Sequence, residues 1–181
     1  MNMPLAKLKA ILLYFCANTD QKFLGKVKLM KLFYFLDFTH VKKYGMPVTF
    51  DNYVNLEHGP IPSTIKNLVD AACDDADNSV LADVIYCERS EESMINRILP
   101  KRNFSENDKK YFSKSELDVL EVVCMRFGAR NTKYIEDASH KESPWKKTKM
   151  LDNKPYSLAI EDKDCVVSRE EISLFAKIYS D

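Results

Sequence analysis

The sequence predicts a mainly helical α+β domain, with about six to seven helices around a central helix at residues 25–44 and a small antiparallel sheet. Three observations predict this class. Apolar residues dominate the central stretch at helical spacing. Serine-to-glutamate capping patterns open further helical segments. Short runs rich in β-branched and aromatic residues, bounded by polar turns, indicate a few strands.

Length and composition indicate a single domain over residues 1–181. The chain has 181 residues, 45% hydrophobic and 30% charged, which is enough to bury a sizeable core. Its 27 basic and 27 acidic side chains balance, so no overall charge attracts nucleic acid or an anionic membrane. We therefore expect no membrane partner and consider nucleic acid a weak candidate. Composition leaves the oligomeric state open.

Cysteine usage favours a reducing compartment. The five cysteines are odd in number and widely spaced, and no CxxC pair or Cys/His run indicates zinc or redox chemistry. Cys16 and Cys124 lie in apolar helical runs and are predicted to be buried thiols. No signal-peptide pattern opens the chain, and no apolar run reaches the roughly 18 residues of a membrane span. We expect a soluble, cytoplasmic protein.

The central helix has clear end signals. It begins near Gly25, Gly45 sits where a left-handed C-terminal cap would end it, and Pro47 bars continuation. At about 100° per residue, its basic side chains Lys28, Lys31 and Lys42 fall on one narrow stripe. We interpret these lysines as a solvated face.

The opposite face of this helix is apolar, yet Asp37, His40 and Tyr44 project into it. A carboxylate and an imidazole at i, i+3 can meet on a helix, so we predict a buried, hydrogen-bonded pair of Asp37 and His40. Most aromatic residues of the helix are expected in the core. Tyr34, on the flank beside the lysine stripe, is the one expected to be partly exposed.

The remaining elements follow from periodicity, caps and turn residues. Helices are predicted at residues 3–18, 62–74, 113–128, 132–140, 143–150 and from 168 onward, the last with Ile172, Phe175 and Ile178 inward. Strands are predicted at 48–57, 80–88 and 94–99, with further short strands possible within 155–167. Between them, Pro60 and Pro62 stiffen a turn that begins at His58.

An ordered set of residues carries a family resemblance. It consists of Lys28-Leu29-x-Lys31-Leu32-x-Tyr34-Phe35-x-Asp37, His40, Lys43-Tyr44-Gly45-x-Pro47, Tyr53 and His58-Gly59-Pro60-x-Pro62, and it extends to Ser139-His140 and Pro144-Trp145. This pattern resembles the Panacea domain, the SocA-like family of antitoxins associated with prophages and mobile elements. Leu36 replaces the small residue that this family carries after Tyr34-Phe35, which changes packing.

The resemblance implies an antitoxin that neutralises a cognate toxin by direct contact, without a chemical step or a cofactor. Some family members act as adaptors that deliver the toxin to a cytosolic protease, so a protease is a second implied partner. The residues that the resemblance marks as partner-binding or family-motif candidates are Lys28, Lys31, Tyr34, Asp37, His40, Tyr44, Gly45, Tyr53, His58, Gly59, Pro60, Pro62, His140, Pro144 and Trp145.

Two alternatives stay open. A small metal- or histidine-dependent enzyme could use His40, His58, His140 and Asp37, although their spacing matches no known metal signature. The chain has no GxSxG, P-loop, HExxH, EF-hand or GxGxxG motif, and its four glycines leave little for a phosphate-binding loop.

The other alternative is a DNA-binding regulator. The lysine stripe of the central helix and a second group around Trp145 could contact phosphates. That second group comprises Lys141, Lys146, Lys147 and Lys149. We interpret both groups as solubilising, and neither adjacent helix pair shows the short turn of a helix-turn-helix.

Overall fold

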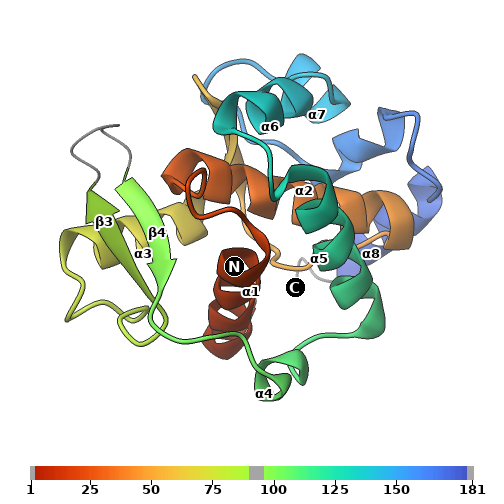
Figure 1. Cartoon of the computed structure of the whole chain (residues 1–181). Helices are drawn as coiled ribbons and strands as arrows, with labels where there is room; N and C mark the ends of the chain where they lie inside the picture. The colour runs from red at the N-terminus through yellow and green to blue at the C-terminus, as the bar shows by residue number, and fades with distance from the viewer. Residues whose placement is uncertain (1–2, 90–95, 179–181) are drawn as a thin grey trace.

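The computed structural model describes residues 3–89 and 96–178, the last four of these by their backbone. Helix α2, Lys26–Tyr44, runs through the middle of the molecule, and the other elements surround it (Figure 1). The remaining helices are α1 Leu5–Asn18, α3 Ser63–Asp74, α4 Glu106–Lys109, α5 Lys114–Phe127, α6 Thr132–Ser139, α7 Ser143–Lys146, the 3₁₀ helix η1 Tyr156–Glu161 and α8 Arg169–Ile178. The α+β, mainly helical class is confirmed.

Local signals explain where the helices begin and end. Gly45, at φ 82°, forms the left-handed cap of α2, and its N–H donates to Val41 O at 2.9 Å. The capping box of Ser113 and Glu116 starts α5 as predicted. A box of Ser168 and Glu171 precedes α8. The predicted inward positions Phe175 and Ile178 lie outside the described side chains, whereas Ile172 is buried.

The strands form two separate hairpins. Strand β1, Tyr53–Leu56, pairs antiparallel with β2, Gly59–Pro62, and β3, Ile85–Arg89, pairs with β4, Asn96–Pro100. In Figure 1 the β3–β4 hairpin and α3 lie on one side of α2, with α6 and α7 on another. The predicted strand residue Met94 and the turn before it lie outside the described residues.

Several predicted boundaries are wrong. The strand predicted from residue 48 starts only at Tyr53, because the backbone before it bonds to a side chain of α2. The predicted turn at 58–62 is mostly strand β2, since the chain reverses at residues 57–58. The predicted helix at 143–150 ends at Lys146, and the possible strands at 155–167 are replaced by η1.

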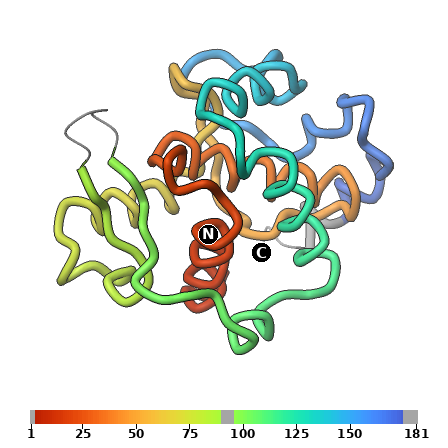
Figure 2. The backbone as a smooth tube through the Cα atoms, viewed as in Figure 1, coloured from red at the N-terminus to blue at the C-terminus, as the bar shows by residue number. Residues whose placement is uncertain are grey.

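After α7 the chain returns along β1, so this strand is bonded on both edges. Leu151 N donates to Asn55 O at 2.8 Å, and Lys154 N donates to Tyr53 O at 2.8 Å. Figure 2 follows the backbone from α5 through α6 and α7 into this returning segment. The first hairpin is thereby tied to the C-terminal third of the chain.

A covalent link joins the second hairpin to its neighbouring helix. Cys73 of α3 and Cys87 of β3 form a disulfide, with their Cα atoms 4.9 Å apart. The spacing of the cysteines did not predict this bond. Cys16 and Cys124 are buried free thiols, as expected. Burial raises the pKa of each of these two thiols to about 12.

The core is built on the aromatic residues of α2. Phe35 packs against Phe127 of α5, with ring centroids 4.3 Å apart. The ring of Phe38 lies 4.4 Å from that of Tyr34, 5.4 Å from Tyr53 and 5.1 Å from Tyr156. Tyr34 is fully buried, so its predicted partial exposure is wrong.

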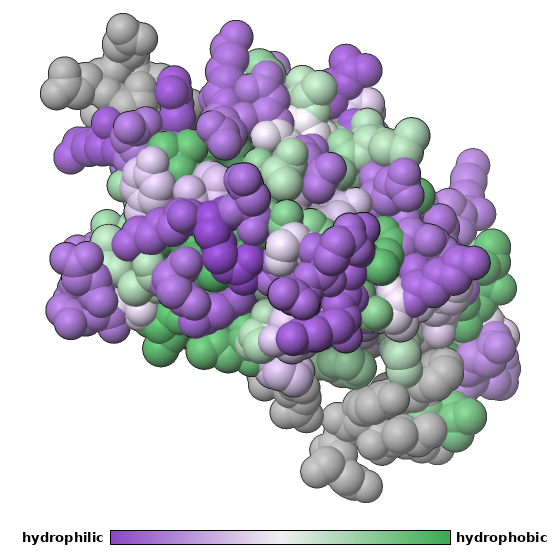
Figure 3. Space-filling view, turned by 60° about the horizontal axis from the view of Figure 1, so that its bottom comes forward, coloured by the Kyte–Doolittle hydropathy of each residue, from purple (hydrophilic) through white to green (hydrophobic). Residues whose placement is uncertain are grey.

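The outer surface is largely polar. Seen from the side of α4, charged side chains dominate and hydrophobic residues form separate patches (Figure 3). Within the described residues, none of the helices combines the length and the apolar character that crossing a membrane requires.

We predict that Phe38→Ala lowers the free energy of unfolding by about 3–5 kcal/mol, because it empties the centre of an aromatic cluster. Urea unfolding monitored by circular dichroism measures this loss. Met125→Ala is the matched control, since Met125 is 79% exposed on α5, and it should change stability by less than about 0.5 kcal/mol. Equal effects of the two substitutions would contradict this description of the core.

Candidate functional site

Four charged residues of α2 are buried; three of them belong to the candidate motif, and the fourth, Lys42, does not. Lys28, Lys31, Asp37 and Lys42 are each at most 2% exposed. The interpretation of the three lysines as a solvated face is therefore wrong. Helical spacing placed them on one stripe, but α5, β2 and the segment before α7 cover that stripe. Each buried charge requires a polar partner, because desolvation of an unpaired ion is costly.

Asp37 organises the chain that follows α2. Its Oδ1 accepts hydrogen bonds from the backbone N–H groups of Val48 and Thr49, both at 2.8 Å. Its Oδ2 accepts from the Thr49 hydroxyl and, at 2.9 Å, from the Tyr53 hydroxyl. Burial raises the pKa of this carboxyl to about 6, and the hydrogen bonds act in the opposite direction. This residue fixes the backbone that leads into β1.

His40 is also buried but does not pair with Asp37. Its Nδ1 lies 2.7 Å from Met46 O, and its Nε2 lies 3.1 Å from Ser115 Oγ on α5. Among the described contacts, none joins it to Asp37, so the predicted pair is wrong. Tyr44 stacks on the imidazole with centroids 4.8 Å apart and is 41% exposed, contrary to its expected inward position. Burial lowers the pKa of His40.

Lys28 binds the backbone carbonyls at the C-terminal end of α5. Its ammonium donates to Gly128 O at 2.8 Å and to Arg130 O at 2.6 Å. These carbonyls belong to the helix C-terminus and the following turn, where backbone acceptors lack helical partners and a cation is favourable. Burial lowers the pKa of Lys28 to about 8.

Lys31 reaches the first hairpin, where Gly59 leaves room for it. Its ammonium donates to Pro60 O at 2.8 Å, and burial lowers its pKa to about 7. Gly59 has φ +95°, and the atoms nearest to the position of an added Cβ are Lys31 Nζ at 2.9 Å, Ser139 Oγ at 3.0 Å and His140 Nε2 at 3.1 Å. A side chain at Gly59 is excluded by both backbone conformation and space.

Lys42 and Tyr34 meet at Glu142, in the turn between α6 and α7. The Lys42 ammonium donates to Glu142 Oε1 at 2.9 Å, and the Tyr34 hydroxyl donates to Oε2 at 2.9 Å. Lys42 also pairs with Asp164 at 3.0 Å and Asp162 at 3.6 Å. Burial raises the pKa of Glu142, although Lys42 opposes this.

The last motif residues, His140 and Trp145, stack on each other at α7, and Lys154 lies beside the indole ring. The Trp145 ring stacks on His140 with centroids 3.9 Å apart, and Lys154 Nζ lies 5.1 Å from the indole centroid. Lys154 is buried and donates to Pro144 O at 2.9 Å. Burial lowers the pKa of Lys154 to about 8 and also lowers that of His140.

Five buried charged residues were not predicted as site residues: Lys42, Asp51, Asp108, Glu142 and Lys154. Asp51 caps α3 from a distance, since its carboxylate accepts from Thr64 N at 3.1 Å and Ile65 N at 2.8 Å. A capping pattern normally lies within three residues, so this one left no local signal. Glu142 and Lys154 contact residues from other segments, so they likewise left no local signal in the sequence.

The three histidines do not gather. His58 is exposed at the tip of the first hairpin, with Nδ1 3.5 Å from Glu136 Oε1. His140 lies near Lys31, whereas His40 is nine residues further along α2, about 14 Å away along the helix. The site of His40, His58, His140 and Asp37 considered for an enzyme is therefore not assembled. Within the described ranges, no group of three or more His, Cys, Asp or Glu residues could hold a metal ion.

The lysines considered for DNA contact separate into two groups. Those of α2 are buried, so they offer nothing to phosphates. Lys141, Lys146, Lys147 and Lys149 are exposed, as expected for a solubilising group. Two lysine groups motivated the nucleic-acid alternative. Of these, the group of four around Trp145 is exposed.

The motif residues thus hold the fold together, and few of them reach the surface. The helices and strands that carry these motif residues lie almost entirely within the part of the chain that matches a known family. The family model described as "Antitoxin SocA-like, Panacea domain" matches residues 29–146, about two thirds of the chain. The chain belongs to the Panacea family. No curated protein and no solved structure matches it. The match runs from the first turns of α2 to the last residue of α7.

We predict that Asp37→Ala lowers the free energy of unfolding by at least about 3 kcal/mol, because it leaves two buried N–H groups and two hydroxyls without their acceptor. Urea unfolding of purified protein measures the change. Asp118→Ala, on the exposed side of α5, is the matched control and should shift stability by less than about 0.5 kcal/mol. A change at Asp37 as small as the control's would show that its hydrogen bonds do not hold residues 48–53.

We predict that stability rises between about pH 7 and pH 8.5. Lys31, Lys28 and Lys154 have pKa values of about 7 to 8 when folded, against 10.5 for an ordinary lysine. The unfolded chain therefore binds more protons in this window, and raising the pH favours the folded state. Lys31 alone contributes on the order of 1–2 kcal/mol.

Urea midpoints across this window measure the slope. Lys31→Met should flatten it, and Lys101→Met, which removes an exposed lysine, should leave it unchanged. The window stays below the ordinary thiol pKa of 9.0, above which the buried cysteines would oppose the trend. A slope that is zero or negative in the wild type would contradict burial of these ammonium groups.

Proposed function

We propose that this protein is an antitoxin that neutralises a cognate toxin by direct protein–protein binding. Membership of the Panacea family of SocA-like antitoxins, over residues 29–146, is the observation that carries the proposal. The toxin is expected to be the product of the adjacent gene, and a protease that removes the bound toxin is a further expected partner.

The arrangement of the buried lysines of α2 supports a binding scaffold. Lys31 joins α2 to the first hairpin, and Lys42 joins it to the α6–α7 turn. These bonds fix the relative positions of two surface segments, and a pre-organised surface loses less entropy on binding. Exposed Tyr134, in α6, and Met150 and Leu151, after α7, flank the α6–α7 turn along the chain, and large side chains of this kind are typical of interface cores.

Co-expression with the adjacent gene tests the proposal. The neighbour expressed alone should arrest growth, and co-expression should restore growth and yield a complex that co-purifies. A neighbour that is harmless alone, or toxicity that this protein does not relieve, would refute the antitoxin function.

Toxin abundance separates the two routes of neutralisation. In the direct route the toxin accumulates in an inactive complex. In the adaptor route its half-life falls when this protein is present and recovers in a host lacking the cytosolic protease. Rescue with unchanged toxin levels and no complex would instead favour chemical detoxification.

A further inference from the structure

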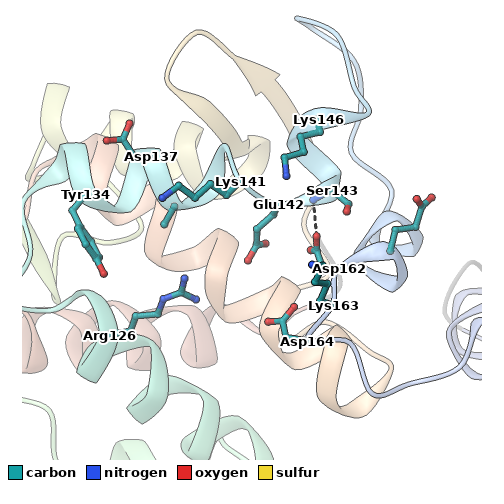
Figure 4. A pocket seen from close by; sticks show the side chains of 12 residues that line it. Arg126, Tyr134, Asp137, Lys141, Glu142, Ser143, Lys146, Asp162, Lys163 and Asp164 are labelled. Atoms are coloured by element: carbon teal, nitrogen blue, oxygen red, sulfur yellow. Dashed lines mark hydrogen bonds between the residues drawn. The ribbon is translucent and has the colours of Figure 1, made fainter.

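A pocket of about 540 Å³ lies between α5, α6, the α6–α7 turn and the segment after η1. Glu142, Asp162 and Asp164 belong to its lining, and Figure 4 shows their carboxylates directed toward a common space from two distant segments. The buried Lys42 ammonium lies behind this floor of three carboxylates, within 4 Å of each of them. Three carboxylates facing one ammonium leave the floor with excess negative charge.

One carboxylate oxygen of this floor has no hydrogen-bond donor. The side chain of Asp162 is only 10% exposed. Its Oδ1 accepts from Ser143 N at 2.7 Å, the bond dashed in Figure 4. Its Oδ2 is buried and accepts no hydrogen bond, and Lys42 Nζ, at 3.6 Å, is too far to donate one. A buried acceptor in this state favours an incoming donor.

The rim has the opposite charge. Lys141, Lys146 and Lys163 are exposed there, and no ion pair engages them among the described residues. Arg126 is committed to aromatic contacts, with its guanidinium carbon 4.7 Å from the Phe127 centroid and 5.3 Å from that of Phe35. The rim lysines are solvated and screened, whereas Glu142 and Asp162 are largely shielded from water, so these two carboxylates act more strongly on a group inside the pocket.

We propose that this pocket receives a basic side chain of the partner protein, best an arginine, from a segment whose neighbouring acidic residues meet the lysine rim. A guanidinium donates several hydrogen bonds in a planar fork, so it can bond the exposed Asp164 carboxylate and, once side chains shift to uncover it, Asp162 Oδ2. It also loses less hydration than an ammonium when it is buried. The proposal rests on the proposed function, because the partner in question is the toxin.

Charge substitutions test this with the product of the adjacent gene as the probe. Asp164 has a 65% exposed side chain, so Asp164→Lys is expected to fold, and a thermal melt checks this. It should weaken toxin binding on the order of 10- to 100-fold. Asp162→Asn should weaken it in the same direction. Asp118→Lys makes the same charge change on the outer side of α5 and should stay within about twofold of the wild type.

If wild type and Asp164→Lys bound the toxin with equal affinity, the proposed role of the pocket would be refuted, but the antitoxin function would not. Absence of any complex with the wild type would refute direct binding instead. A second probe makes the pocket testable without the toxin. N-acetyl-arginine methylamide should shift the backbone amide signals of Ser143 and Asp162 in the NMR spectrum of labelled wild type. The neutral citrulline analogue should not.

Loss of these shifts in Asp164→Lys is expected. No response of the wild type to the arginine probe, or the same response to citrulline, would overturn the proposal independently of the toxin experiment.

Discussion

The rest of the structure depends on the burial of a charged helix. α2 is covered on all sides, yet it carries three lysines and an aspartate into the core. An unpaired ion there would cost several kcal/mol, so each one has to be matched by a group from another part of the chain. Gly128 O, Pro60 O, the amides of residues 48–49 and Glu142 supply these matches. The positions of four connecting segments follow from this requirement.

Most of these partners are backbone groups, which has a physical consequence. A lysine that donates to a carbonyl needs no buried counter-ion, so only one of two partners pays the desolvation cost of a charge. Backbone partners also make the network tolerant of sequence change at the partner residue, since any residue supplies a carbonyl. Gly59 is the exception, because Lys31, Ser139 and His140 crowd the space beside its Cα. The network therefore fixes a scaffold and leaves the surrounding surface free to vary.

Sequence reasoning succeeded where the cause was local. Gly45 ends α2 and the Ser113–Glu116 box starts α5, because a cap acts within one helical turn. It failed where the cause was distant. Periodicity put Lys28 and Lys31 on one stripe correctly, but it could not show that other elements cover that stripe. The Asp37–His40 pair was predicted from spacing alone, and each side chain has a better partner from a loop or from α5. Asp51 capping α3 left no local trace.

The carboxylates around Lys42 differ from the rest of the network in one respect. The ammonium groups of Lys28 and Lys31 donate to neutral backbone carbonyls, which folding alone explains. Lys42 needs one carboxylate for neutrality and has three, of which Glu142 already meets it at 2.9 Å. Asp162 and Asp164 carry the same charge as Glu142, which is unfavourable where these groups are shielded from water. Excess charge of this kind, at the wall of an open pocket, is what a cationic group of a partner would neutralise, in keeping with the proposed binding role.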